Sequence, residues 1–332
     1  MRIVESTSHA RAGLLGNPSD GYFGKTVAFI VRNYSAKVVL YEWPELEIML
    51  SRQDRCQFDR IDELVGDVEL HGLYGGLRLI KAAIKVFAEY CREQGITLAS
   101  ENFSLRYETN IPRQVGMGGS SAIITAVFRA LEKFYGITIA NPELANLVLA
   151  VETQEIGIAA GLQDRVCQVY EGLIYMDFKR PFFEEHGHGV YEPLDPDLLP
   201  PLFLAHRQNL SQISGVYHSN LRDRWNRGDR EVKEAMGFFA DLAEEGRDCL
   251  LRGDHERLAR LIDLNFDTRS ALVELDPSNV EMVDLARRHG LCAKYAGSGG
   301  SIIGICKSNE EFARLQDSFE KIGCVVVRPQ II

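Results

Sequence analysis

The feature that most constrains this chain is a glycine- and serine-rich segment between a predicted strand and a predicted helix. Apolar residues alternate over residues 103–107, and the chain then enters the segment IPRQVGMGGSSA at residues 111–122. Apolar residues recur at helical spacing from Ile123 to Phe134, just before Gly136. This order requires mixed α and β structure. It also favours an anion site, because the first turn of a helix offers unpaired N–H groups and the positive end of its dipole.

Two known phosphate-binding loops fit the sequence poorly. The dinucleotide fingerprint GxGxxG needs a third glycine, but Ser121 follows Gly116 and Gly118 at that position. Residues 19–26, SDGYFGKT, approach the GxxxxGK[ST] loop, yet the residues that follow are strand-like where that loop needs a helix. The segment at 112–122 remains, because its glycines let main-chain N–H groups approach an anion without obstruction by a Cβ atom.

Periodicity outlines the other elements of the first half. Short strands are predicted at residues 27–31, 37–41 and 47–50, separated at Asn33 and Pro44, and an amphipathic helix follows over 77–95. A further helix is predicted from Asn141, which can cap it, to Glu152 near its end. The first half is therefore expected to contain a sheet that is followed by several helices.

The second half has a different pattern. Helices are predicted over residues 230–252, 254–268 and 279–289, and short strands over 293–296, 302–306 and 325–328. Prolines and mixed charge between residues 179 and 201 make that stretch the best candidate for a connection between two domains. The length of 332 residues also suits about two domains.

Charge, cysteines and histidines narrow the class of protein. A formal net charge of −10 excludes a general binding surface for nucleic acid or anionic membrane. The 7 cysteines are scattered without a CxxC pair, so neither a zinc ribbon nor a disulfide framework is expected. His186 and His188 are interpreted as part of an exposed loop rather than as metal ligands. Because no membrane-length apolar run or signal peptide is visible, we expect a cytoplasmic protein without a nucleic-acid or membrane partner.

Three spaced motifs resemble those of the GHMP kinases, the family of galacto-, homoserine, mevalonate and phosphomevalonate kinases. Residues 11–20, RAGLLGNPSD, are similar to the first motif, and residues 112–122 to the second, PxxxGLGSSA. Residues 294–301, KYAGSGGS, are similar to the third. The resemblance gives these nucleotide-binding candidates in the second motif: Pro112, Gly116, Met117, Gly118, Gly119, Ser120 and Ser121.

Within this family, four segments resemble the pattern of the glucuronokinases. They are LLGNPSDGYFGKT, IPRQVGMGGSSAI, GLQDRV and SGVYHSNLRDRWNRGD. Two positions depart from the wider family pattern. Gly119 replaces the first serine of the usual pair, which leaves open whether Ser120 or Ser121 reaches a metal ion. Asn17-Pro18 replaces Glu-His, so sugar contacts of galactokinases are not transferred to this chain.

The resemblance implies an α+β fold of two domains. Residues 1–195 would form an N-terminal ATP-binding domain with a fold like domain 2 of ribosomal protein S5. Residues 196–332 would form a ferredoxin-like C-terminal domain.

Phosphoryl transfer needs a phosphate cradle, a divalent cation and a group that orients the attacking hydroxyl. Magnesium prefers hard oxygen ligands, and Ser120 and Glu152 supply a hydroxyl and a carboxylate. The resemblance assigns those roles to them and makes Asp164 the catalytic aspartate. Arg11 matches a family arginine that keeps that carboxylate ionised, although a structural ion pair is its alternative. Arg165 is a rival source of the same positive field, with less weight because side chains of adjacent residues usually diverge.

The acceptor contacts are less constrained. The resemblance and the chemistry give these candidate substrate-binding residues: Arg11, Asp20, Tyr22, Lys25, Arg113, Gly297, Ser298 and Gly299. A sugar acid needs a cation for its carboxylate, and Lys25, Arg113, Arg11 and Arg222 are the candidates that the sequence does not rank. His218, Arg222, Arg224 and Trp225 lie in a predicted helical stretch, where Trp225 is also a candidate core residue.

The resemblance implies an ATP- and Mg²⁺-dependent kinase that phosphorylates the anomeric hydroxyl of D-glucuronate. We expect a monomer or a homodimer. Two alternatives are a GHMP kinase for another sugar or a small alcohol, and a non-catalytic nucleotide or sugar sensor on the same fold.

Overall fold

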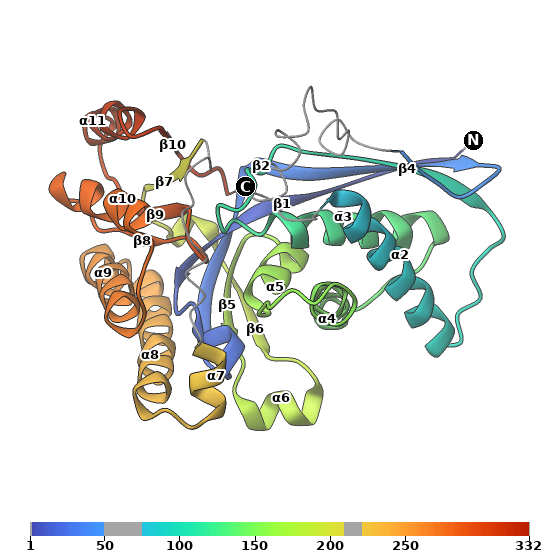
Figure 1. The fold of residues 1–332 in the computed structure, drawn as a ribbon, viewed down its shortest axis with the longest axis horizontal. Helices are drawn as coiled ribbons and strands as arrows, with labels where there is room; N and C mark the ends of the chain where they lie inside the picture. The colour runs from blue at the N-terminus through green and yellow to red at the C-terminus, as the bar shows by residue number, and fades with distance from the viewer. Residues whose placement is uncertain (1, 50–74, 209–220, 332) are drawn as a thin grey trace, which may run out of the picture. The chain divides into compact units, whose positions relative to one another are not determined.

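The computed structural model describes residues 2–49, 75–208 and 221–331 (Figure 1). The chain divides into two compact units, and each is assembled from three stretches. Unit 1 comprises Met1–Ala10, Tyr34–Ile111 and Gly118–Val169, and unit 2 comprises Arg11–Asn33, Pro112–Met117 and Tyr170–Ile332. His218 and Cys56 lie outside the described residues, and the domain boundary between residues 195 and 196 stays a prediction.

Two long strands, β1 (Ile3–Leu15) and β2 (Lys25–Trp43), pair with each other and run through both units. The prediction of two short strands in place of β2 was wrong, because Asn33 does not interrupt it. The Asn33 Nδ2 donates to the Arg328 carbonyl oxygen at 3.1 Å, and Asn33 Oδ1 accepts from the Gln330 N–H at 2.8 Å. The polar side chain therefore has partners while the backbone stays extended.

In unit 1, the second half of β2 pairs antiparallel with β4 (Asn102–Thr109), and β4 pairs parallel with the short β3 (Glu47–Met49). The helices of this unit are α2 (Gly76–Glu93), α3 (Gly119–Tyr135), α4 (Asn141–Ala150) and α5 (Gln163–Tyr170). Helices α2, α3 and α4 pack against one another (Figure 1). The strand, loop and helix predicted around residues 103–136 are therefore confirmed.

Helix α4 begins differently from the prediction. Its N-cap is Ala140, and Asn141 is already helical. The Asn141 Oδ1 instead accepts a hydrogen bond from Arg129 Nη2 at 2.7 Å. The expected cap was wrong because a tertiary partner uses that side chain.

In unit 2, the first half of β2 pairs antiparallel with β5 (Leu173–Asp177), which pairs with β6 (Val190–Leu194). Residues 179–201 are not an irregular connection, because they also contain helix α6 (Arg180–His186) and the short 3-10 helix η3 (Pro196–Leu198). A second, antiparallel sheet has the order β10-β7-β9-β8. Its strands are β7 (Leu202–Arg207), β8 (Lys294–Tyr295), β9 (Ser301–Ile305) and β10 (Cys324–Val327).

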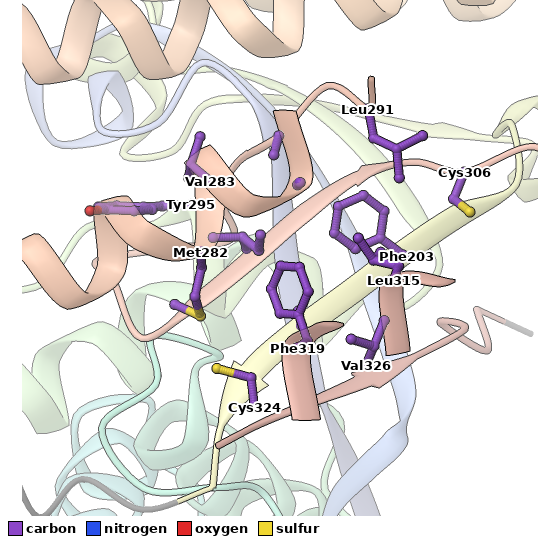
Figure 2. Packing of buried hydrophobic residues seen from close by; sticks show 14 of the residues in the cluster. Phe203, Met282, Val283, Leu291, Tyr295, Cys306, Leu315, Phe319, Cys324 and Val326 are labelled. Atoms are coloured by element: carbon purple, nitrogen blue, oxygen red, sulfur yellow. The ribbon is translucent and has the colours of Figure 1, made fainter. Parts of the chain in front are cut away.

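The remaining helices of unit 2 are α7 (Leu221–Asn226), α8 (Arg230–Arg252), α9 (His255–Leu272), α10 (Pro277–Arg288) and α11 (Asn309–Glu320). Helices α8 and α9 pack against each other (Figure 1). Figure 2 shows the hydrophobic core of the second sheet, where Phe203, Leu315, Phe319 and Val326 gather from β7, α11 and β10. Burial of each such side chain contributes about 1.5–3 kcal/mol, so this core fixes the sheet that carries the third glycine-rich turn.

Candidate active site

The predicted phosphate loop has the backbone that such a loop needs. Gly116 and Gly118 both adopt left-handed conformations, with φ of 68° and 72°. Helix α3 begins at Gly119 with Gly118 as its N-cap, so no side chain caps the first turn. An anion can therefore approach the N–H groups of that turn. The rival loop at residues 19–26 leads into β2 rather than into a helix, which confirms that it is no P-loop.

In unit 1, Glu152 is the centre of a buried charge cluster. Its side chain is 1% exposed, and it lies in a π-helical turn, Val151–Glu155, that continues α4. The Ser120 Oγ donates to Glu152 Oε1 at 2.6 Å, and the Arg165 Nε donates to Glu152 Oε2 at 2.6 Å. The Arg165 Nη2 also donates to Oε2. One carboxylate oxygen is thus held by a cation, and the other faces a hydroxyl.

Arg165 has a larger part in this cluster than the sequence suggested. Besides its contacts with Glu152, its Nη1 donates to the Gly161 carbonyl oxygen at 2.8 Å and lies 3.5 Å from Asp164 Oδ2. The expectation that the neighbours Asp164 and Arg165 diverge was wrong, because the long Arg165 side chain brings its guanidinium to the Asp164 carboxylate. A fully buried glutamate requires a cation, but the sequence does not show that Glu152 is buried.

The two serines at the start of α3 have different partners. Ser121 is buried, and its Oγ donates to the Gly118 carbonyl oxygen at 3.1 Å. The same carbonyl oxygen accepts from Gln168 Nε2 at 2.8 Å. Ser121 therefore stabilises the helix start, while Ser120 is the serine beside Glu152.

In unit 2, the third glycine-rich motif is the turn between β8 and β9, and it packs on the first half of the phosphate loop. A Cβ atom added to Gly116 would lie 2.7 Å from the Gly299 carbonyl oxygen and 2.9 Å from the Ser298 nitrogen. A Cβ atom on Gly297 would collide with the Gly116 carbonyl oxygen. The Ser301 Oγ donates to the Val115 carbonyl oxygen at 2.6 Å. Glycine is therefore needed on both sides of this contact.

Arg11 connects the same two loops. It is buried, its main-chain N–H donates to the Met117 carbonyl oxygen at 3.1 Å, and its Nη1 donates to Gly116 and Ala296 carbonyl oxygens at 2.6 and 3.1 Å. The guanidinium thus bonds to main-chain oxygens of the second and third motifs. These contacts position the loops, and the catalytic role of Arg11 stays a prediction.

Lys294 is a buried cation to which the sequence analysis assigned no role. It is 1% exposed, and its Nζ donates to the Gly13 carbonyl oxygen, Asn17 Oδ1 and the Tyr295 carbonyl oxygen at 2.8, 2.7 and 2.8 Å. Burial lowers the pKa of Lys294 well below its usual value, and Arg269 and Arg11 lower it further. All three N–H groups of an ammonium are used, so Lys294 fastens the first motif to the third.

A side chain from α9 strengthens this connection. Asn265 Oδ1 accepts from the Gly16 N–H at 2.8 Å, and Asn265 Nδ2 donates to the Asn17 carbonyl oxygen at 3.2 Å. The Asn17 Nδ2 in turn donates to the Gly297 carbonyl oxygen at 3.4 Å. Every polar atom of this buried network that is named here has a partner, as burial requires.

The candidate acceptor residues lie in different surroundings. Asp20 and Tyr22 belong to the 3-10 helix η1 (Ser19–Tyr22), and burial raises the pKa of Tyr22. Lys25 is paired with Glu244 at 2.7 Å. Arg113 is exposed and follows Pro112 on the phosphate loop. The structure thus places Asp20 and Tyr22 in one 3-10 turn, while Lys25 is engaged in an ion pair and Arg113 lies on the phosphate loop.

Three wider searches of the described residues are informative. Between residues 2 and 331, outside the two gaps, no cluster of three or more His, Cys, Asp or Glu residues could hold a metal ion. No helix in the part of the chain that the structure describes has the length and hydropathy needed to span a membrane. Six cysteines are free and buried, as expected: Cys91, Cys167, Cys249, Cys292, Cys306 and Cys324.

The three motifs resemble those of a kinase family, and comparison with known families agrees. The model of the GHMP kinase N-terminal domain matches residues 78–172, and that of the GHMP kinase C-terminal domain matches residues 247–323. The chain belongs to the GHMP kinase family. The predicted two-domain α+β fold of this family is confirmed.

Individual relatives place the chain more narrowly. It is 45% identical over 327 residues to glucuronokinase 1 of Arabidopsis thaliana, covering 96% of this chain and 90% of that protein. It is 43% identical over 338 residues to probable glucuronokinase 2 of the same plant, covering 98% and 90%. The galactokinase of Lactococcus lactis, solved with galactose, has the same fold, with a TM-score of 0.77 at 14% identity over 99% of this chain and 94% of its own.

Proposed function

We propose that this chain is a glucuronokinase, which transfers the γ-phosphoryl group of ATP to the anomeric hydroxyl of D-glucuronate. The products are ADP and D-glucuronate 1-phosphate. The observation that carries the proposal is the 45% identity to an Arabidopsis glucuronokinase across 96% of this chain. The buried cluster around Glu152 supports it, because phosphoryl transfer needs charge placed at a fixed position.

The donor site fits a nucleotide with magnesium. The glycine-rich segment from Gly116 to Ser121 offers helix N–H groups to the phosphates. The Ser120 Oγ and Glu152 Oε1 are hard oxygen donors 2.6 Å apart, and Mg²⁺ takes few protein ligands because it keeps waters and phosphate oxygens. When bound, the ion would neutralise the negative charge of the phosphates. Arg165 orients one oxygen of the Glu152 carboxylate and leaves the other beside Ser120, which favours Ser120 over Ser121 as the second metal ligand.

Asp164 is proposed as the group that orients the acceptor hydroxyl and accepts its proton. Its side chain is 17% exposed, so solvent or a substrate can reach it, and Arg165 Nη1 lies 3.5 Å from its Oδ2. Arg11 is proposed to support the same step. Asp20, Tyr22 and the turn Gly297–Gly299 are proposed as acceptor contacts.

The proposal extends to the organisation of the enzyme. We propose a domain boundary between residues 195 and 196 and a protein that is a monomer or a homodimer. We also propose a cytoplasmic location, because the described cysteines are unpaired, as is usual in a reducing compartment.

The proposal is tested with a substrate panel of D-glucuronate, D-galacturonate, D-galactose, a heptose phosphate, homoserine and mevalonate, with ADP release as the readout. Glucuronate should give the largest kcat/KM, and chelation of magnesium should abolish turnover. A larger value for a neutral sugar or an alcohol would assign the chain to another acceptor. Tight ATP binding without turnover of any acceptor would favour a sensor.

A pair of variants tests the role of Asp164. The Asp164→Asn protein should lose about 10²–10⁴-fold in kcat with its fold intact. Asp197→Asn changes an exposed acid at the start of η3 and should retain full activity. Equal kcat values for the wild type and Asp164→Asn would refute the proposed catalytic role.

A further inference from the structure

Several arginines of the second half are neutralised by a carboxylate. These pairs are Arg224–Asp229, Arg230–Glu234, Arg247–Glu192, Arg257–Glu245 and Arg287–Asp263. Arg222, in the first turn of α7, forms no ion pair with any residue of the ranges 2–49, 75–208 and 221–331. Its positive charge is therefore not cancelled by a carboxylate within these ranges, in a chain with a net charge of −10.

Arg222 is held over the loop that carries Asp20 and Tyr22. Its Cζ lies 4.4 Å from the centre of the Tyr22 ring, a cation–π contact. Its Nη2 lies 3.0 Å from the position that a Cβ atom on Gly21 would take. The Trp225 ring, one turn further along α7, lies 5.1 Å from the Tyr22 ring on the same loop. An exposed guanidinium thus lies over an aromatic ring on a loop that also carries an aspartate, a set of groups suited to a polar, ring-shaped ligand.

The loop that carries Asp20 and Tyr22 is connected by hydrogen bonds to the third glycine-rich motif of unit 2. Asn17, which lies just before the loop, donates to the Gly297 carbonyl oxygen, and Lys294 holds its Oδ1. The turn that contains Gly297 packs on Gly116 of the phosphate loop. Since an acceptor hydroxyl must meet the transferred phosphoryl group, a loop anchored at this position is a reasonable place for the acceptor.

The other cations are engaged elsewhere. Lys25 is paired with Glu244, and Arg11 donates to main-chain oxygens of the two glycine-rich loops. Lys294 donates all three of its N–H groups to oxygen atoms of the protein. Arg113 lies on the phosphate loop and has a partner of its own. Of the candidate cations named here, Arg222 is exposed and lies over Tyr22.

From this geometry we infer that Arg222 binds the carboxylate of the sugar acid and is the residue that selects an acidic over a neutral acceptor. The inference rests on the proposed function. A guanidinium group can bind a carboxylate through two parallel N–H···O hydrogen bonds. Stacking on Tyr22 orients the plane of the Arg222 guanidinium before the ligand binds. Asp20, in the same 3-10 turn as Tyr22, would accept hydrogen bonds from ring hydroxyls.

The test compares Arg222→Gln and Arg222→Lys with the wild type and with Arg230→Gln, an exposed arginine paired only with Glu234. Arg222→Gln should raise the KM for D-glucuronate by about 10–100-fold, because a hydrogen-bonded charge pair is lost, and leave the KM for ATP unchanged. Arg222→Lys should recover part of the loss, since it keeps the charge without the planar guanidinium. Arg230→Gln should match the wild type.

The outcomes separate the inference from the proposed function. A glucuronate KM within twofold of the wild type in Arg222→Gln, or an equal rise in the KM for ATP, would overturn the inference while leaving a glucuronokinase. A wild-type protein that releases no ADP with glucuronate would overturn the proposed function and the inference with it. Tyr22→Leu provides a second check, because it removes the ring under Arg222 and should raise the same KM.

Discussion

Two buried charges, one in each unit, are stabilised in opposite ways. Glu152 in unit 1 is balanced by the opposite charge of Arg165. Lys294 in unit 2 is held by three neutral oxygen atoms, from Gly13, Asn17 and Tyr295. Both side chains are almost fully buried, at 0% and 1% exposure, so the difference lies in the partners rather than in the depth.

The difference in partners indicates that Glu152 can bind a ligand, whereas Lys294 stabilises the structure. Glu152 keeps one oxygen beside a serine hydroxyl, where a cation can join it without breaking the pair with Arg165. Lys294 has no N–H left for a ligand, and its three bonds join the first and third motifs. Removal of Arg165 should therefore leave an unpaired buried charge, whereas removal of Lys294 should leave only unsatisfied dipoles.

The largest effect is expected from Arg165→Met. It leaves the Glu152 carboxylate buried without a cation, which should lower the free energy of unfolding by about 3–5 kcal/mol in urea titrations. The double variant Arg165→Met with Glu152→Gln should recover much of that loss, because the uncompensated charge is gone. Equal stability of the single and double variants would show that Arg165 acts through packing instead.

A smaller loss is expected from Lys294→Met. The substitution leaves carbonyl and amide oxygens without a donor, which should cost about 1–3 kcal/mol. Lys321→Met, at the exposed end of α11, is the matched control and should stay within about 0.5 kcal/mol of the wild type. A loss as large as that of Arg165→Met would erase the distinction between the two charges.

The lowered pKa of Lys294 should make the stability of the protein depend on pH. Burial places the pKa of Lys294 in the folded chain below the ordinary value of 10.5. Between these two pKa values the unfolded chain binds more protons, so the stability of the wild type should rise with pH relative to Lys294→Met. Urea titrations of both proteins from about pH 8 to about pH 10 measure this difference. A difference that stays constant or falls would mean that the pKa is not lowered.

The smallest change in stability is expected from Ser120→Ala, within about 1 kcal/mol, because Arg165 still holds the Glu152 carboxylate. Its effect should be on the magnesium requirement, with the concentration for half-maximal activity raised several-fold. Ser121→Ala, which removes the bond to Gly118, should alter stability and leave that concentration unchanged. The reverse pattern would assign the metal to Ser121.

The sequence predicted those parts of the molecule that depend on local pattern. The phosphate loop was found because Gly118 and Gly136 bound a helix with clear periodicity, and α8 was found to the residue for the same reason. The continuity of β2 was missed, because the partners of Asn33 come from residues 328 and 330. Local patterns do not show such long-range bonds.

The sequence predicted which residues form the candidate site but not which of them contact one another. Ser120, Glu152 and Asp164 were named from their motifs, and the structure brings them together through Arg165. Arg165 and Lys294 were undervalued, since an arginine or lysine in a sequence is usually exposed and only tertiary packing buries it. The missed residues are thus the ones whose roles depend on burial.

The central claim is tested most directly by the identity of the product. The purified protein is incubated with ATP, magnesium and D-glucuronate, and the sugar phosphate is analysed by ³¹P nuclear magnetic resonance. The account predicts a phosphate coupled to the anomeric proton, formed in equal amount with ADP. Phosphate on any other hydroxyl, or ADP formed without a sugar phosphate, would contradict it.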